Sequence, residues 1–146
     1  MCLASNTKIN VASYLQTPEI VEQLEEAPYE VLGVYKRNDP SFVQGLYWDT
    51  QSGRLVESTG LYGKSITQWL SVDEKKKNIR SELSVPFPAK QFGEGIAPLD
   101  DNRFIELTWL ERTVRILDRD TLQELASFAM WPGVKEGWGI TLDPVN

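Results

Sequence analysis

Histidine is absent from the 146 residues of this chain, and cysteine occurs once, as Cys2. Without histidine there is no Ser-His-Asp triad, no Cys-His dyad and no zinc site with imidazole ligands. A lone cysteine forms no internal disulfide, so it does not indicate the redox compartment. These absences exclude much of the common hydrolase and metalloenzyme chemistry, and we expect neither a metal site nor a cofactor.

Basic residues and long apolar runs are also scarce. Lys and Arg number 15 against 21 Asp and Glu, which gives a net charge of −6. No basic stripe is present, so we expect no nucleic-acid partner and no anionic membrane surface as a partner. No run of 18 apolar residues predicts a membrane span. Residues 1–8 lack a basic region followed by an apolar one, so no signal peptide is predicted and the compartment stays open.

The composition that remains is that of one globular domain, with 41% hydrophobic residues. Residues 1–28 differ from the rest of the chain. Within them, Thr17-Pro18-Glu19 has the pattern of a helix N-cap followed by proline at the first helical position. We predict an N-terminal arm with a short acidic helix over 18–26, the alternative being a solvated arm without a helix.

From Tyr29 onward, short segments rich in Val, Ile, Leu, Thr and aromatic residues alternate with turn residues. This pattern indicates an all-β fold with a strand about every ten residues. The predicted strands are 30–36, 43–48, 54–58, 64–72, 79–85, 94–99, 103–109, 113–118, 122–129 and 138–142.

Three of these strands repeat one another. Gly45, Gly95 and Gly139 each precede an aliphatic residue, and they lie 50 and then 44 residues apart. The strands that follow the first two also match, 54–59 against 103–108. A repeat of about four strands and 44–50 residues is typical of a β-propeller blade.

The repeat predicts a partial β-propeller over residues 29–146. Two blades are expected at about 43–86 and 93–131, and a third begins at 138. One four-stranded blade cannot bury both of its faces, so blades stack around an axis. Closed propellers have four or more blades. We therefore expect a truncated propeller or one completed by another chain, with open sheet edges that favour self-association.

The repeat also selects candidate functional residues. Gln44, Glu94 and Trp138 occupy the same repeat position, just before the glycine of the innermost strand. Innermost strands line the central channel of a propeller, where three such different groups are unlikely to serve packing alone. Trp109, at the end of a second strand, is expected near Trp138, so the two predict an aromatic pocket beside a carboxylate. The alternative is that Glu94 is a solvated turn residue and that the tryptophans belong to the core.

The densest local motif is Glu57-Ser58-Thr59-Gly60-Leu61-Tyr62-Gly63. Its two glycines predict a structured loop that positions Glu57 and Tyr62, and structural support is the alternative role. Trp48 and Trp69 are predicted to pack in the core or between blades.

Five motifs in order carry a family resemblance. They are Gln44-Gly45-Leu46, Glu57-Ser58-Thr59-Gly60-Leu61-Tyr62-Gly63, Phe92-Gly93-Glu94-Gly95, Leu107-Thr108-Trp109 and Glu136-Gly137-Trp138-Gly139. The series resembles the plant and bacterial type of glutaminyl-peptide cyclotransferase from about Tyr29 to Asp143.

The resemblance implies a fold and an activity. The family is a five-bladed, zinc-independent propeller that converts the N-terminal glutamine of peptides to pyroglutamate and releases ammonia. By resemblance, Glu94 matches the catalytic glutamate, and Trp109 and Trp138 match tryptophans of the substrate pocket. Gln44 and Glu57 are further candidates for substrate binding. The family's other functional positions, an Asn, a Trp and a Lys in later blades, have no counterpart here, and the family is usually exported.

Two functions remain open at this point. In the first, the chain is a cyclotransferase, and its partner is a peptide or protein with an N-terminal glutamine. Alternatively, it is a non-catalytic propeller fragment that acts as an interaction module, or that needs a second chain for activity.

Overall fold

The computed structural model describes residues 29–37 and 41–143, and these residues form nine β-strands. The predicted helix over 18–26 lies outside the described residues. The described part of the chain contains no helix with the length and apolar character to cross a membrane. The all-β prediction is confirmed.

The first sheet holds five strands in the order β1-β5-β4-β3-β2. They are β1 (Lys36–Arg37), β2 (Val43–Asp49), β3 (Arg54–Thr59), β4 (Ile66–Asp73) and β5 (Asn78–Pro86). Strands β2 to β5 pair antiparallel in chain order, and β1 adds to the edge parallel to β5.

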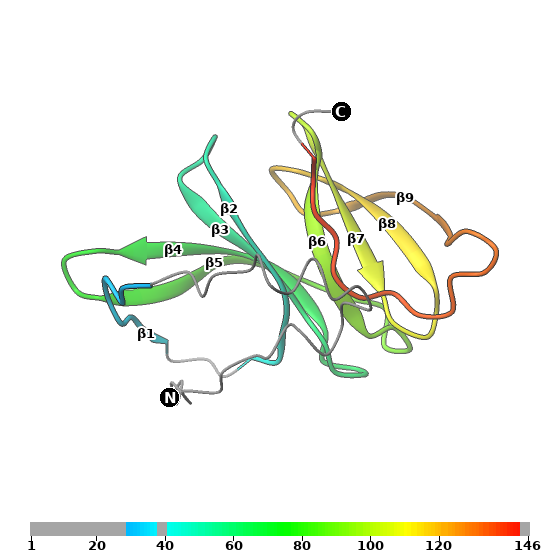
Figure 1. Cartoon of the computed structure of the whole chain (residues 1–146), viewed down its shortest axis with the longest axis horizontal. Helices are drawn as coiled ribbons and strands as arrows, with labels where there is room; N and C mark the ends of the chain where they lie inside the picture. Colours follow the sequence, from blue (N-terminus) through cyan, green and yellow to red (C-terminus); the bar gives the residue numbers. More distant parts are fainter. Residues whose placement is uncertain (1–28, 38–40, 144–146) are drawn as a thin grey trace, which may run out of the picture.

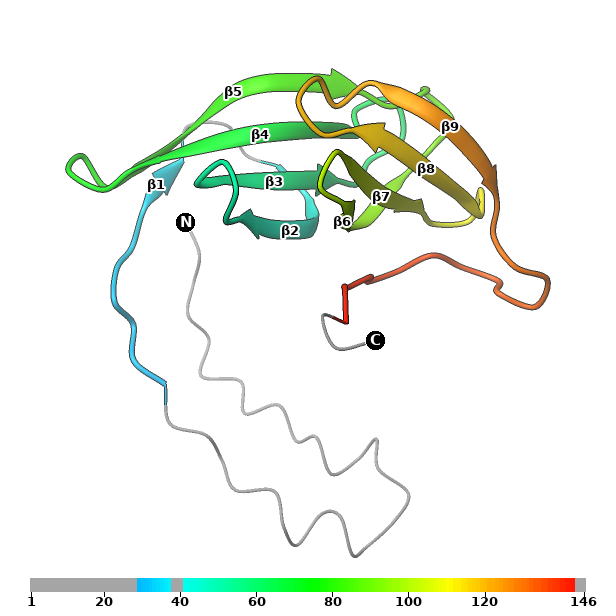
Figure 2. The same cartoon turned by 90° about the horizontal axis from the view of Figure 1, so that it is seen from above.

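The second sheet holds four antiparallel strands in the order β6-β7-β8-β9. They are β6 (Gly93–Asp100), β7 (Arg103–Thr108), β8 (Thr113–Asp118) and β9 (Glu124–Ala129). In both sheets, the long strands follow one another in chain order, beginning with β2 in the first sheet and β6 in the second. Figures 1 and 2 show β2 and β6 on the inner side of the molecule, with β5 and β9 on the outer side.

Two predictions about single segments and one about a single residue were wrong. The segment predicted as a strand over 30–36 is strand only from Lys36, and it is largely exposed before that point. Residues 138–142 form no regular strand, although they follow the course of β6 in Figure 1. Trp69 is fully buried as predicted, but Trp48 is 48% exposed, because no described segment covers that side of β2.

The two sheets share one apolar core. Val56 and Trp69 of the first sheet pack with Ile96, Phe104 and Leu117 of the second, all at 7% exposure or less. The Trp69 and Phe104 rings meet edge to face, with their centroids 5.5 Å apart. Each sheet therefore covers the apolar face of its neighbour, which a single four-stranded sheet cannot do for itself.

Glycine allows the inner strands to approach each other closely. A Cβ atom at Gly45 would lie 2.7 Å from the backbone nitrogen of Ile96 and 2.9 Å from the carbonyl oxygen of Glu94. At these distances, no larger residue fits without moving the backbone. Gly45, the glycine of the repeat in β2, is therefore the point at which the backbone of β6 contacts β2.

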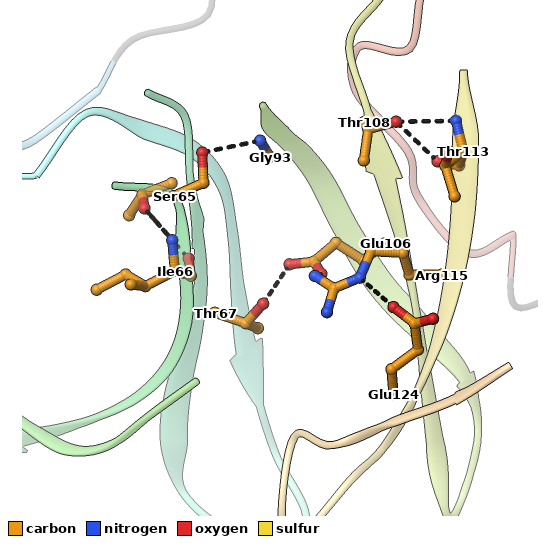
Figure 3. Close-up of polar contacts among 10 residues, drawn as sticks. Ser65, Ile66, Thr67, Gly93, Glu106, Thr108, Thr113, Arg115 and Glu124 are labelled. Atoms are coloured by element: carbon orange, nitrogen blue, oxygen red, sulfur yellow. Dashed lines mark hydrogen bonds and ion pairs between the residues drawn. The ribbon is translucent and has the colours of Figure 1, made fainter. Parts of the chain in front are cut away.

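A buried polar network crosses between the sheets (Figure 3). Thr67 on β4 donates a hydrogen bond from Oγ1 to Oε1 of Glu106 on β7, at 2.7 Å. The other carboxylate oxygen of Glu106 accepts from Arg115 on β8, also at 2.7 Å, and Arg115 reaches Glu124 on β9 at 2.8 Å. Thr67, Glu106 and Arg115 are each at most 2% exposed. Their hydrogen bonds therefore satisfy polar groups that water does not reach.

We predict that Thr67→Val lowers the free energy of unfolding by about 1–3 kcal/mol, because it removes a donor to a buried carboxylate while keeping the side-chain shape. The matched control is Thr50→Val, at an exposed turn residue, which is expected to change little. Urea denaturation of both variants measures the effect. Equal losses in the two variants would contradict a stabilising link between the sheets at Thr67.

Candidate active site

The central feature of the candidate site is a carboxyl group bound to an amide. Glu94, the second residue of β6, accepts a hydrogen bond at Oε1 from Nε2 of Gln44, the second residue of β2, at 2.8 Å. Glu94 is 3% exposed, whereas Gln44 is half-buried. Two residues that the repeat places at equivalent positions are thus in direct contact, 50 residues apart in the chain.

Glu94 differs from the other buried acids of the described residues. Those three acids each form an ion pair with an arginine. The pairs are Asp49 with Arg119, Glu57 with Arg37, and Glu106 with Arg115. Glu94 instead has the neutral amide of Gln44 as its side-chain partner. A buried carboxylate without a cation is costly to keep charged, so this arrangement is unusual for a purely structural acid.

Burial raises the pKa of Glu94 above its ordinary value of 4.5, and the hydrogen bond from Gln44 opposes that rise. The direction follows from solvation, because water stabilises the charged form and the protein interior does not. A carboxylate with a raised pKa is a stronger proton acceptor than an ordinary one. The site therefore holds a group suited to acid–base chemistry.

Aromatic side chains lie on the segments that contact the chain on either side of Glu94. The Trp109 and Trp138 rings are 6.0 Å apart between centroids, and the Phe92 and Trp109 rings are 5.5 Å apart. Trp138 is 54% exposed, which makes its ring available to a ligand. The structure thus brings the two predicted tryptophans together, and Trp109 also donates from Nε1 to Oε2 of Glu136 at 3.2 Å.

Backbone hydrogen bonds hold the aromatic residues against the strand that carries Glu94. The amide of Gly95 donates to the carbonyl oxygen of Trp138 at 2.9 Å. The amide of Trp109 donates to the carbonyl oxygen of Phe92 at 3.0 Å. Phe92 and Gly95 flank Glu94 closely in sequence. The backbones of Trp109 and Trp138 are therefore held near Glu94, because the end of β7 and the segment at Trp138 both bond to the chain around it.

Glu57 lies in a different network. It is 1% exposed, and its carboxylate accepts hydrogen bonds from Arg37, from Ser41 at 3.0 Å and from Gln68 at 2.9 Å. The structure does not bring Glu57 into contact with the group formed by Gln44 and Glu94. Its predicted part in substrate binding stays a prediction.

Sequence reasoning missed the second layer behind the tryptophans. The Phe92 ring contacts both Trp109 and Tyr62, and the Tyr62 hydroxyl donates to Oε1 of Glu111 at 2.8 Å. Oε2 of Glu111 in turn accepts from the amide of Phe92 at 3.1 Å. A signal was present, because phenylalanine stands two residues before both Gln44 and Glu94 in the repeats.

The described residues contain no cluster of three or more His, Cys, Asp or Glu side chains placed to hold a metal ion. The acid–base group and the aromatic rings are the chemical resources that these residues offer at the site.

Comparison with known proteins decides the family. The family model described as glutamine cyclotransferase matches residues 3–145. The chain belongs to the glutamine cyclotransferase family. A glutaminyl-peptide cyclotransferase of Arabidopsis thaliana is 31% identical to it over 114 residues, which are 78% of this chain and 33% of that protein.

A solved structure supports the fold of this family member. The crystal structure of Myxococcus xanthus glutaminyl cyclase matches with a TM-score of 0.58 at 24% sequence identity. The match covers 74% of this chain and 41% of that chain. The chain thus spans about a third of the Arabidopsis relative and two-fifths of the solved structure. At this identity the structural likeness concerns the fold alone.

We predict that Gln44→Leu raises the pKa of Glu94 further, because the substitution removes a hydrogen bond that favours the charged carboxylate. The pKa is measured from the pH titration of the Glu94 side-chain carboxyl carbon by NMR. The matched control is Gln51→Leu, at an exposed turn residue, which is expected to leave this titration unchanged.

The raised pKa also has a consequence for stability. Because the pKa of Glu94 is raised in the folded state, Glu94 contributes to the free energy of unfolding most strongly below its ordinary pKa of 4.5. This contribution is lost as the pH rises through the pKa that Glu94 has in the folded state. Each pKa unit of the rise corresponds to about 1.4 kcal/mol. Gln44→Leu is therefore expected to enlarge this loss. A pKa of Glu94 that falls or stays constant in Gln44→Leu would contradict the assigned role of Gln44.

Proposed function

We propose that this chain carries part of a glutaminyl-peptide cyclotransferase site, with Glu94 as its general acid and base. The observation that carries the proposal is the burial of Glu94 beside Gln44 instead of an arginine, on a strand whose flanking residues bond to the backbone of Trp109 and Trp138. Membership in the glutamine cyclotransferase family supports the same reaction.

The reaction we propose is an intramolecular acyl transfer. The α-amine of an N-terminal glutamine attacks the carbonyl carbon of its own side-chain amide, which closes a five-membered lactam. The carboxylate of Glu94 takes a proton from the attacking amine and passes one to the leaving amide nitrogen. The carbon–nitrogen bond of the side-chain amide then breaks, and the products are pyroglutamyl peptide and ammonia. General acid–base help of this kind contributes roughly 10²–10⁴ in rate.

The aromatic residues are assigned to binding and orientation. In the proposal, Trp109 and Trp138 enclose the short side chain of the substrate and hold its amine against the amide carbon. Correct placement of two reacting groups removes much of the entropic barrier. The hydrogen bond from Trp109 to Glu136 and the ring contact with Phe92 support a fixed orientation of this indole.

Gln44 and Glu57 have different parts in the proposal. The amide of Gln44 faces the same site as Glu94, where it holds the carboxyl group and leaves one oxygen for the substrate. Glu57 is proposed as a substrate-binding residue from the family motif alone. Its hydrogen bonds favour an indirect effect through Ser41 and Gln68.

The finer architecture is also a proposal. We assign 1–28 to an N-terminal arm and 29–146 to a partial β-propeller, with blades at 43–86 and 93–131 and a third begun at 138. Two sheets of four consecutive antiparallel strands, with β2 and β6 at the inner side, support this interpretation. The contact of Gly95 with the segment at Trp138 supports a third inner segment.

A second candidate function follows from surfaces that the described residues leave uncovered. Phe42, Leu46 and Trp48 are each about half exposed, which is unusual for adjacent large apolar residues. A non-catalytic fragment would use such a surface to bind a partner, or the chain would need a second chain for activity. Peptide turnover by the purified chain distinguishes these two outcomes from an active enzyme.

We predict that the purified chain converts a peptide with N-terminal glutamine to its pyroglutamyl form, and that Glu94→Gln slows this reaction by about 10²–10⁴. The substitution keeps the size of the side chain and an oxygen that accepts from Gln44, but it removes the proton carrier. Mass spectrometry follows the loss of ammonia from the peptide.

The matched control is Glu82→Gln on the outer strand β5, where the carboxylate is 43% exposed and pairs weakly with Arg54. It is expected to retain full activity. Turnover that survives in Glu94→Gln would overturn the assigned role of Glu94. An inactive wild-type chain would refute activity of the chain by itself and favour the second candidate function.

A further inference from the structure

The carboxylate of Glu111 joins three segments of the two sheets. Glu111 lies in the turn between β7 and β8, two residues after Trp109. Its Oε1 accepts a hydrogen bond from the hydroxyl of Tyr62 at 2.8 Å, and its Oε2 accepts from the backbone amide of Phe92 at 3.1 Å. Tyr62 belongs to the turn between β3 and β4, and Phe92 directly precedes β6. One side chain therefore ties the turn after Trp109 to the first sheet and to the segment that leads to Glu94.

Aromatic rings follow the same course. The rings of Tyr62 and Phe92 are 5.4 Å apart between centroids, and those of Phe92 and Trp109 are 5.5 Å apart. Both contacts are edge to face, with interplanar angles of 63° and 60°. Contacts of this geometry favour a defined angle between neighbouring rings. The place of Tyr62 is therefore coupled through Phe92 to the indole of Trp109.

Phe92 is the central member of this group and is held at several points. Its amide donates to Glu111, and its carbonyl oxygen accepts from the amide of Trp109 at 3.0 Å. A Cβ atom at Gly60 would lie 2.1 Å from Cε1 of the Phe92 ring, so a larger residue would displace this ring. Gly60 and Tyr62 belong to the densest local motif of the sequence. That motif thus forms the surface on which Phe92 lies.

The hydrogen bonds of Glu111 fix geometry more than they add stability. Tyr62 is 48% exposed, and Phe92 and Glu111 are half-buried. Water reaches these residues and offers their polar groups alternative partners, so the net gain from each bond is modest. The two oxygens of one carboxylate nevertheless hold the Tyr62 hydroxyl and the Phe92 amide at fixed places relative to each other.

We propose that Glu111 is a positioning residue for the aromatic part of the candidate site. Its carboxylate holds Tyr62 and Phe92 and thereby sets the angle of the Trp109 indole. The effect on turnover rests on the proposed function, in which Trp109 encloses the side chain of the substrate glutamine. The effect on the orientation of Trp109 does not depend on that function.

A second hold on Trp109 supplies a means of measuring its orientation. The indole donates from Nε1 to Oε2 of Glu136 at 3.2 Å, and the carbonyl oxygen of Trp109 accepts from the amide of Gly137 at 3.1 Å. Without the carboxylate of Glu111, these contacts keep Trp109 in place while its ring is free to turn. The NMR signal of the indole N–H is sensitive to such a turn, because it depends on the hydrogen bond to Glu136.

We predict that Glu111→Gln and Tyr62→Phe both shift the indole N–H signal of Trp109 in the folded chain. Glutamine has the length of glutamate but offers one acceptor oxygen in place of two. Phenylalanine keeps the ring contact with Phe92 and removes only the hydroxyl donor. The larger shift is expected for Glu111→Gln, which affects both hydrogen bonds. Two-dimensional proton–nitrogen NMR measures the shift, and the absence of the signal in Trp109→Phe assigns it.

The matched control is Tyr35→Phe. Tyr35 also donates its hydroxyl hydrogen to a glutamate, Glu74, but it lies next to β1, at the outer edge of the first sheet. The substitution removes the same kind of exposed hydrogen bond at a different place. It is expected to leave the indole signal of Trp109 unchanged.

In an active chain, Glu111→Gln is expected to raise KM for a peptide with N-terminal glutamine by about 3- to 10-fold. The range corresponds to the loss of one well-oriented aromatic contact. A purely structural role of Glu111 would reduce the amount of folded chain, which lowers the apparent kcat and leaves KM unchanged. Tyr62→Phe combined with Glu111→Gln is expected to have the same KM as Glu111→Gln alone, because both substitutions remove one link.

Two results would overturn the proposal. One is an indole signal of Trp109 that stays in place in both Glu111→Gln and Tyr62→Phe. The other is an unchanged KM in an active Glu111→Gln chain. A wild-type chain without turnover would refute only the activity of the chain by itself, and the NMR result would then decide the role of Glu111.

Discussion

The close approach of successive inner strands is the constraint on which the rest of this structure depends. It is possible only at glycine, because any Cβ at Gly45 or Gly95 would overlap backbone atoms of the next inner segment. Once the inner strands meet there, the sheets that they lead come face to face and bury Val56, Trp69 and Phe104 between them. The same approach brings Gln44 against Glu94, so the candidate site and the core share one cause.

The buried acids show how the fold separates stability from chemistry. Asp49, Glu57 and Glu106 are each neutralised by an arginine, which holds strands or sheets together. Glu94 lacks such a partner among the described residues. Burial raises the pKa of Glu94, and it also raises the pKa of Glu106, to about 7, despite the arginine beside it. The fold thus pairs three buried carboxylates with cations and leaves the fourth, that of Glu94, beside an amide. That difference in pairing is the physical basis on which we propose Glu94 as the reacting group.

Much of the fold could be predicted from the sequence, because strand propensity and turn residues act locally. Eight of the predicted strands coincide closely with β2 to β9. The failures are segments whose strand character depends on a partner. Val31 and Leu32 have strand propensity, but they are 66% and 87% exposed and lie before the two paired residues of β1. Residues 138–142 accept one backbone hydrogen bond from β6, from the Gly95 amide to the Trp138 carbonyl oxygen, but they form no regular ladder with it.

The sequence by itself determined the all-β class, the spacing of the repeats and the glycines that mark the inner strands, because these depend on residue type and on short-range pattern. It also singled out Glu94, Trp109 and Trp138 before their contacts were visible. Only the tertiary structure decided which acids are paired. Arg119 lies 70 residues from Asp49, and Gln44 lies 50 residues from Glu94. No local pattern relates residues that far apart, so the partners of Asp49 and Glu94 are decided only where the sheets meet.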